Sequence, residues 1–210
     1  PSLGMHPNNS AVHVFSHCNI VRAPGDVLID GTMVVRDGIV ENVGKGIAAP
    51  QGATVHDLHG FWIFPGFIDA WSSLGLERSK KDPEAPGQSP QYLTKEKGPG
   101  NWNEAVQPEF EAANHINLDK KVAAELRALG FTTLHIVPND GIFRGSSALL
   151  NLGDERLQQE LLRPELGSCL SWDKGATHQS YPSSLMGAIA LIRQTLYDAA
   201  WYAQVAKQRQ

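Results

Sequence analysis

The chain has 210 residues and a mass of 22.9 kDa, and its 41% hydrophobic and 19% charged residues suit a globular domain with a buried core. Its net charge of −4 comes without a block of basic residues, which argues against nucleic-acid binding through a phosphate-neutralising patch. No apolar run approaches the roughly 20 residues of a membrane-spanning helix, so no membrane span is predicted.

The chain begins Pro1-Ser2-Leu3-Gly4, without an initiator methionine and without an apolar signal region. This start fits a mature exported protein and a truncated chain equally well. Two cysteines, Cys18 and Cys169, are too few to identify the redox compartment. The sequence leaves open whether they pair.

The first structured region is predicted to consist of short β-strands. Residues 1–10 are polar and irregular, which predicts a tail, and residues 11–62 read as the strands. Within them, Asp37-Gly38 separates two strand-like segments. This dipeptide suits the positive φ angles of a tight hairpin turn.

An apolar strand and a long loop follow. Residues 61–68 form a nearly continuous apolar run, which is typical of a parallel strand buried on both faces. Because Pro65-Gly66 would interrupt a central strand, we expect the strand to begin at Gly66 or Phe67. Residues 77–101 are rich in Lys, Pro, Gly, Gln and Ser and predict a long loop, for which a solvated excursion is favoured over a lid.

Regular structure is predicted to resume with a helix and a second buried strand. Asp119 is a good N-cap residue, and Gly130 is placed to end the helix. The apolar residues of one helical face are Val122, Leu126 and Leu129. Residues 131–137 then read as a strand. Strand, helix and strand in this order predict a βαβ unit with parallel strands.

The last part of the chain is predicted to contain a connection and a long helix. Gly145-Ser146-Ser147 is typical of a loop. The final helix is expected to open at Ser183 or Ser184 and to run through residue 208. Its predicted apolar stripe consists of Leu185, Ile189, Ile192 and Leu196.

Several short motifs occur together in a characteristic order. They are Gly31-Thr32, Asp37-Gly38-Ile39-Val40, Val43-Gly44, Asp57-Leu58-His59-Gly60 and Pro65-Gly66-Phe67-Ile68-Asp69. In this combination the chain resembles the amidohydrolase superfamily, in particular its imidazolonepropionase-like and dihydroorotase-like members, over about residues 11–210. The resemblance implies an α/β fold, namely the N-terminal part of a (β/α)8 barrel preceded by small β-sandwich strands.

The implied domain organisation is a β-sandwich portion over residues 11–62 and the first βα units of an incomplete TIM-like barrel over residues 63–210. A closed (β/α)8 barrel needs about 250 residues. Fewer than 150 residues follow residue 62. We therefore expect open sheet edges, covered by the remainder of the same polypeptide or by another copy of the chain.

The resemblance also implies a zinc site that this chain has lost. In the family the Pro-Gly-Phe-Ile-Asp-Ala strand is followed by His-x-His, whereas here these two positions hold Trp71 and Ser73. An indole offers no lone pair to a cation, and a hydroxyl is a poor substitute for an imidazole. No metal is therefore expected in this chain, although zinc is expected in complete family members.

Three further stretches resemble a bacterial subgroup of long, tandem amidohydrolase-like proteins whose first barrel unit lacks the His-x-His pair. They are residues 102–106, 140–145 and 181–189. Localisation stays open between the bacterial cytoplasm and periplasm, with a lean toward export.

Four residues are candidates for a ligand pocket. Asp69 precedes the two lost ligand positions, and His135 lies in the second strand, where a hydrogen-bonded structural role is favoured. Asp140 and Arg144 follow that strand, at the edge where such barrels bind ligands. They are candidates for orienting an anion, with a salt bridge or loop cap as the favoured alternative.

Two functions are consistent with these patterns. In the first, the chain is part of a hydrolase that acts on non-peptide carbon–nitrogen bonds, and the chain by itself is expected to lack the metal site and to be inactive. Alternatively, it is a non-catalytic structural or interaction module that packs against an active barrel domain. The replacements at Trp71 and Ser73 favour the second role for this chain alone.

Overall fold

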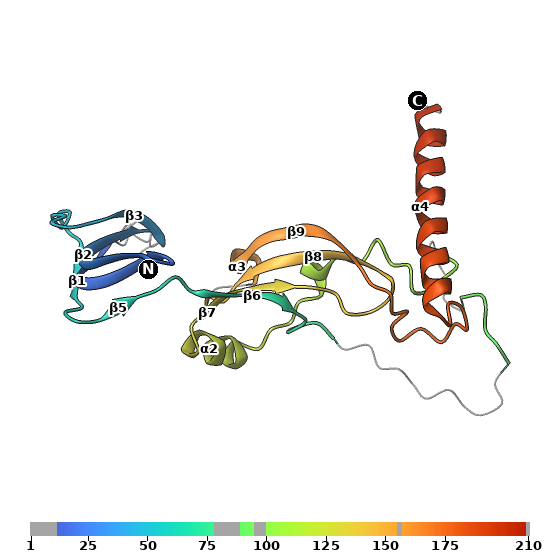
Figure 1. The fold of residues 1–210 in the computed structure, drawn as a ribbon, viewed down its shortest axis with the longest axis horizontal. Helices are drawn as coiled ribbons and strands as arrows, with labels where there is room; N and C mark the ends of the chain where they lie inside the picture. Colours follow the sequence, from blue (N-terminus) through green and yellow to red (C-terminus); the bar gives the residue numbers. More distant parts are fainter. Residues whose placement is uncertain (1–11, 78–88, 95–99, 155–156, 209–210) are drawn as a thin grey trace, which may run out of the picture. The chain divides into compact units, whose positions relative to one another are not determined.

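The computed structural model describes residues 12–77, 89–94, 100–154 and 157–208 (Figure 1). The chain divides into two compact units, residues 1–65 and residues 66–210, and each unit is described by itself. The tail predicted for residues 1–10 lies outside the described residues. So does most of the loop predicted for residues 77–101.

The first unit is one five-stranded sheet in the order β3-β2-β1-β4, with β5 also paired to β1. Its strands are β1 (Val12–Ala23), β2 (Asp26–Arg36), β3 (Ile39–Gly44), β4 (Thr54–Asp57) and β5 (Trp62–Ile63). Strands β1, β2 and β3 are antiparallel neighbours, whereas β4 and β5 run parallel to β1. A small core of Val12, Val14 and Val34 lies on one face.

The predicted hairpin turn of this unit is present. It joins β2 to β3 at Asp37 and Gly38, whose φ angles are 51° and 79°. Positive φ at both central residues matches the right-handed twist of the paired strands, and Gly38 adopts it without a steric cost. The local sequence is therefore sufficient to predict this turn.

The second unit is built on a four-stranded sheet in the order β6-β7-β8-β9. The strands are β6 (Phe67–Ser72), β7 (Phe131–Ile136), β8 (Phe143–Asn151) and β9 (Leu161–Leu170). The helices are α1 (Ala112–His115), α2 (Lys120–Ala128), α3 (Leu157–Glu160) and α4 (Leu185–Gln208). In chain order α2 lies between β6 and β7, as a βαβ crossover requires, and Figure 1 shows it on one side of the sheet.

The βαβ unit predicted for β6, α2 and β7 is confirmed, since β6 and β7 pair in parallel. The strand β6 begins at Phe67, as the Pro65-Gly66 interruption predicts. Helix α2 begins after Asp119, whose carboxylate accepts a hydrogen bond of 2.8 Å from the Lys121 backbone N–H. Ala123 packs with the buried side chains of Leu134 and Ile136 on one face of the sheet.

The sheet then departs from the predicted series of βα units. Strand β8 is antiparallel to β7, and β9 is antiparallel to β8, so the described sheet is mixed and a (β/α)8 barrel is not confirmed. The loop predicted at Gly145-Ser146-Ser147 is wrong, because these residues lie inside β8. Local loop propensity is overridden here by pairing with β9, which matches Ser146 with Ser168 and Ser147 with Gly167.

The burial predicted for residues 61–68 is also wrong in the described structure. Phe67 and Ile68 are 61% and 63% exposed, and Phe61, Trp62 and Phe64 are exposed as well. For Phe67 and Ile68 the reason is topological: β6 is the terminal strand of its sheet, and β7 is its partner among the described strands. An apolar run identifies a strand that suits burial on both faces, but it does not supply the neighbours that bury it.

Helix α4 begins where predicted but packs through a different face. Ser184 caps it, since its Oγ accepts a hydrogen bond of 3.2 Å from the Gly187 N–H. The buried residues are Ala188, Leu191 and Ile192, which pack with Ala105, Val106 and Ile142. The predicted stripe is therefore confirmed only at Ile192, because Leu185, Ile189 and Leu196 are exposed. The small side chain of Ala188 lets the helix approach Ala105, Val106 and Ile142 closely. A prediction based on the spacing of large apolar residues misses such a contact.

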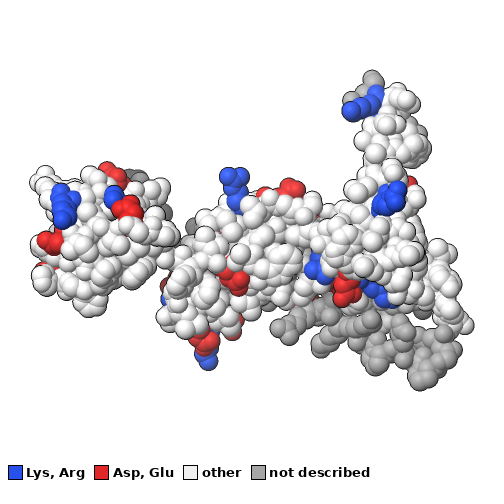
Figure 2. All heavy atoms as spheres, viewed as in Figure 1, with Lys and Arg blue, Asp and Glu red and all other residues white. Residues whose placement is uncertain are grey.

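Helix length and surface charge bear on whether the chain has a membrane-spanning helix or a basic binding patch. None of its helices has both the length and the apolar character needed to cross a membrane. Figure 2 shows the Lys and Arg side chains of the described residues scattered over the visible face rather than gathered into one patch.

We predict that Gly145→Ala destabilises the second unit by about 2–4 kcal/mol. Gly145 has a φ of 80°, and a Cβ there would overlap the Phe110 carbonyl oxygen. Urea unfolding followed by tryptophan fluorescence measures the effect, since four of the five tryptophans lie in this unit. The matched control is Gly167→Ala on β9, where a Cβ meets nothing within 4 Å. Equal stability of the two variants would contradict the prediction.

We also predict that the two cysteines differ in reactivity. Both are free thiols, Cys18 buried in the first unit and Cys169 half-buried on β9. Burial raises the pKa of the Cys18 thiol above its usual value, so less thiolate is present at neutral pH. Native-state alkylation by iodoacetamide at Cys18 should be roughly tenfold or more slower than at Cys169. Peptide mass spectrometry should show this difference vanish in urea, and equal native rates would refute it.

Candidate functional site

The candidate site lies at the C-terminal ends of β6 and β7. Parallel strands end at the same edge of a sheet, so the residues after both strands meet there. At this edge the Val137 backbone N–H donates a 2.7 Å hydrogen bond to the Ser72 carbonyl. The bond extends the β6–β7 pairing beyond the last residue of β7 and fixes the two strand ends side by side.

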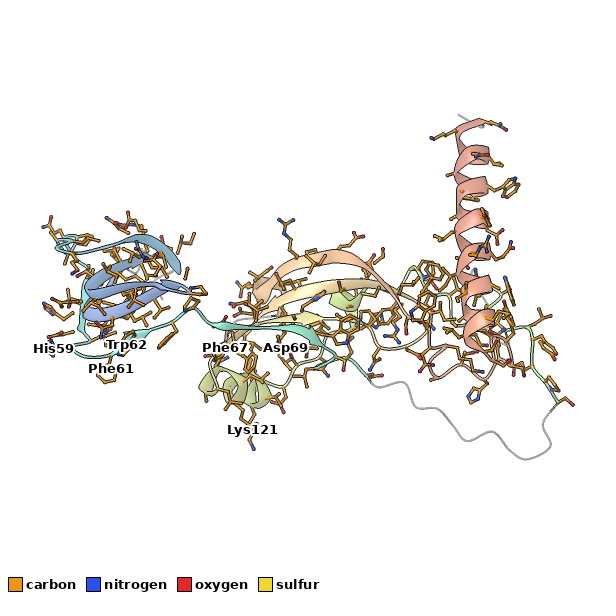
Figure 3. All side chains as sticks on the ribbon, viewed as in Figure 1. His59, Phe61, Trp62, Phe67, Asp69 and Lys121 are labelled. Carbon is orange, nitrogen blue, oxygen red and sulfur yellow. The ribbon has the colours of Figure 1, made fainter. Side chains whose placement is uncertain are left out.

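The end of β6 is shaped by Asp69, which is labelled in Figure 3. Its Oδ1 accepts a hydrogen bond of 3.1 Å from the Trp71 backbone N–H, a local turn that occupies this carboxylate oxygen. The β6–β7 register shifts between Asp69 and Ser72. Within that shift the Trp71 side chain is 67% exposed.

His135 bridges the strands from the face opposite the buried Leu134 and Ile136. One ring nitrogen, Nδ1, lies 2.9 Å from the Ala70 carbonyl oxygen on β6. The other, Nε2, lies 2.9 Å from the Ser147 hydroxyl on β8. Ser147 Oγ in turn lies 3.2 Å from the Gly167 carbonyl on β9. His135 and Ser147 thus link β6, β7 and β8, and Ser147 reaches β9 when its one hydroxyl proton is donated to Gly167.

This network determines the tautomer of His135. A carbonyl oxygen only accepts hydrogen bonds, so Nδ1 carries a proton and donates to Ala70. In neutral His135, Nε2 is then an acceptor, and the Ser147 hydroxyl donates to it. In a protonated ring Nε2 donates to Ser147, and the hydroxyl can turn to the Gly167 carbonyl. The arrangement supplies partners in both states.

Asp140 and Arg144 line a common pocket of about 350 Å³ beyond the ends of β6 and β7. Asp140 Oδ1 accepts a hydrogen bond of 2.6 Å from the Ala176 N–H, so it holds a loop that is distant in sequence rather than its own backbone. Arg144 donates through Nε to the Gly141 carbonyl at 2.9 Å. Asp69 and His135 are not among the residues that line this pocket.

The motif at residues 102–106 has a structural explanation. Buried Asn103 donates to the Tyr181 carbonyl at 2.9 Å and accepts from the Ala105 N–H at 3.0 Å. Buried Gln179 donates to the carbonyls of Tyr92 and Trp102 and accepts from the Glu104 N–H. The two buried amide side chains are thereby satisfied, and they tie residues 102–105 to residues 92, 179 and 181.

No protein-family model matches the chain, but comparisons with individual proteins find two relatives. The chain is 28% identical over 152 residues to imidazolonepropionase from Deinococcus radiodurans. The aligned region covers 69% of this chain and 38% of that protein. The fold of the chain is similar to that of an amidohydrolase from Thermotoga maritima MSB8, with a TM-score of 0.70 and 24% identity. The resemblance to the amidohydrolase superfamily is confirmed. The structural match covers 93% of this chain and 49% of the Thermotoga protein, so the chain spans about half or less of either relative.

The end of β6 offers few groups that zinc prefers. The two positions that the resemblance predicts for the family's imidazole ligands hold an indole at Trp71 and a hydroxyl at Ser73, and neither is a ligand that zinc prefers. Asp69, which precedes them, already accepts a hydrogen bond from its own chain. Among the described residues no three His, Cys, Asp or Glu side chains are grouped to hold a metal ion.

The sequence did not point to every residue that lines the pocket. Phe110 and His115 stack with ring centroids 4.4 Å apart and planes 13° apart, and both line the pocket with Asp140 and Arg144. Their spacing matches no common motif. Phe110 lies just before α1 and His115 ends it, and this segment packs on the sheet through Ala112. The local sequence pattern does not encode that packing.

We predict that the one ring proton of neutral His135 is on Nδ1 rather than on Nε2. Nitrogen-15 NMR of the imidazole distinguishes the two tautomers directly. Ser147→Ala should leave the Nδ1–H tautomer in place, since the Ala70 carbonyl fixes it. His135→Ala should lower the free energy of unfolding by about 1–3 kcal/mol, because Ala70 and Ser147 lose a partner. An Nε2–H tautomer in the unmodified chain would rule out this network.

Proposed function

We propose that this chain is part of an amidohydrolase-family hydrolase that acts on non-peptide carbon–nitrogen bonds, and that it contributes scaffold rather than the metal site. Support for the hydrolase class comes from the similarity to imidazolonepropionase and from the fold shared with the Thermotoga amidohydrolase. The observation that carries the proposal is the strand end itself. It has the family's Pro-Gly-Phe-Ile-Asp approach, with Trp71 and Ser73 where the His-x-His pair belongs.

The donor chemistry at these positions supports a role without metal. A catalytic zinc needs three protein ligands and an open position for water. The β6 end supplies one carboxylate, from Asp69, and that group is held by the Trp71 N–H. His135 does not substitute, because both of its ring nitrogens are occupied by Ala70 and Ser147.

A second candidate function is a structural or interaction module that packs against an active barrel domain. The exposed apolar edge of β6 favours it, since Phe67, Ile68 and Trp71 are all more than half exposed. The open edge would be covered by the remainder of the same polypeptide or by another copy of the chain. The two functions are compatible if the covering domain carries the metal.

A comparison of the 210-residue chain with the complete gene product tests the proposal. Both are assayed with zinc against cyclic amides such as hydantoins, lactams and dihydroorotate. We expect hydrolysis by the complete product and none by the chain. In the complete product, Trp71→Ala with Ser73→Ala should leave zinc content and kcat within about threefold, because these residues hold no metal. Zinc-dependent turnover by the chain alone would disprove the proposal.

We further predict that restoring the family's two imidazoles does not restore the site. The double variant Trp71→His, Ser73→His should bind zinc with a Kd of about micromolar or weaker, since two ligands are not a complete set. Competition with a chromogenic chelator measures this affinity. The control is Trp201→His, which replaces another exposed tryptophan, on α4. Nanomolar zinc binding by the double variant would mean that the other ligands are present after all.

A further inference from the structure

The pocket beside Arg144 has the features of a small-molecule site. Its volume of about 350 Å³ is within the range of ligand pockets, and its wall combines apolar and charged side chains. Leu76 and Phe110 supply apolar surface, and His115 stacks on Phe110. The charged groups are Arg144, Asp140 and Glu77.

Arg144 is positioned to hold an anion. Its Nε donates to the Gly141 carbonyl, and this bond orients the side chain. Both terminal amino groups of the guanidinium stay available to a ligand. Within the described part of the chain these terminal groups have no hydrogen-bond or ion-pair partner. A guanidinium presents its terminal N–H groups as a planar fork that matches the two oxygens of a carboxylate. Arg144 is half-buried in the pocket wall, where such a pair is less screened than at an open surface.

The two carboxylates restrict the class of ligand. Asp140 is fixed by its bond from the Ala176 N–H, and Glu77 lines the same pocket. A multiply charged anion such as a phosphate monoester would be repelled by both. A ligand that carries an ammonium group next to its carboxylate offers a negative group to Arg144 and a positive group to Asp140 and Glu77. The apolar wall of Leu76 and Phe110 then suits a hydrophobic side chain on that ligand.

We propose that this pocket binds a small zwitterionic amino acid with an apolar side chain. Its carboxylate pairs with the Arg144 guanidinium, its ammonium group faces Asp140 and Glu77, and its side chain packs against Phe110. The proposal is independent of the hydrolase function, since it requires binding and no turnover.

Three probes that share one hydrophobic body test the charges separately. They are L-phenylalanine, 3-phenylpropionate, which lacks the ammonium, and phenethylamine, which lacks the carboxylate. Isothermal titration with the 210-residue chain measures each Kd. We expect phenylalanine to bind more tightly than either analogue, by roughly tenfold or more. Failure of phenylalanine to bind, or equal binding of 3-phenylpropionate, would overturn the proposal.

Variants assign the binding to this pocket. Arg144→Gln should abolish phenylalanine binding, and Arg144→Lys should weaken it, because a lysine ammonium does not reproduce the planar fork. Glu77→Gln should reduce the preference for phenylalanine over 3-phenylpropionate. The matched control is Arg163→Gln, an exposed arginine on β9 that does not line the pocket. Circular dichroism checks that each variant is folded, and unchanged binding in folded Arg144→Lys and Glu77→Gln would place the ligand elsewhere.

Discussion

The parallel pairing of β6 with β7 is the arrangement from which the rest of the second unit follows. Parallel neighbours require a crossover, and α2 provides it, capped by Asp119 and packed through Ala123 on Leu134 and Ile136. The pairing also brings both strand ends to one edge. Trp71 and Ser73 at the end of β6 and Asp140 after β7 therefore lie at the edge where barrel enzymes place their chemistry.

His135 reinforces this pairing at one of its two register shifts. The register shift between Asp69 and Ser72 interrupts the β6–β7 ladder, and the Ala70 carbonyl lies within the interruption. The His135 ring donates to that carbonyl and reaches β8 through Ser147. A polar side chain on this face thus does structural work in the sheet. This explains why a histidine inside a barrel-like strand need not be a metal ligand.

Features that depend on a few neighbouring residues could be predicted from the sequence. The Asp37-Gly38 turn, the Asp119 and Ser184 caps and the start of β6 after Pro65-Gly66 are of this kind. Features that depend on distant partners could not. Gly145 to Ser147 belong to a strand because β9 pairs with them, and α4 packs through Ala188 because Ala105 and Ile142 lie opposite.

The same division applies to the candidate site. Asp140 and Arg144 follow a predicted strand, so their place at its end was accessible from sequence. Their common pocket was not, because it also requires Phe110 and His115 from a segment more than twenty residues earlier in the chain. No local sequence pattern indicates that Phe110 and His115 line this pocket.

Both outer strands of the sheet expose apolar side chains, Leu162, Leu166 and Leu170 on β9 and Phe67, Ile68 and Trp71 on β6, but the two strands differ in how well their edges resist pairing with a further strand. Strand β9 contains Arg163-Pro164-Glu165, and a proline with flanking charges discourages pairing with a further strand. Strand β6 has Asp69 as its one charged residue, and it exposes Phe67, Ile68 and Trp71. Burial of each such side chain stabilises a complex by about 1.5–3 kcal/mol, which offsets part of the entropy lost on association. The edge chemistry therefore supports the proposal that a covering domain extends the sheet at β6, next to Trp71 and Ser73.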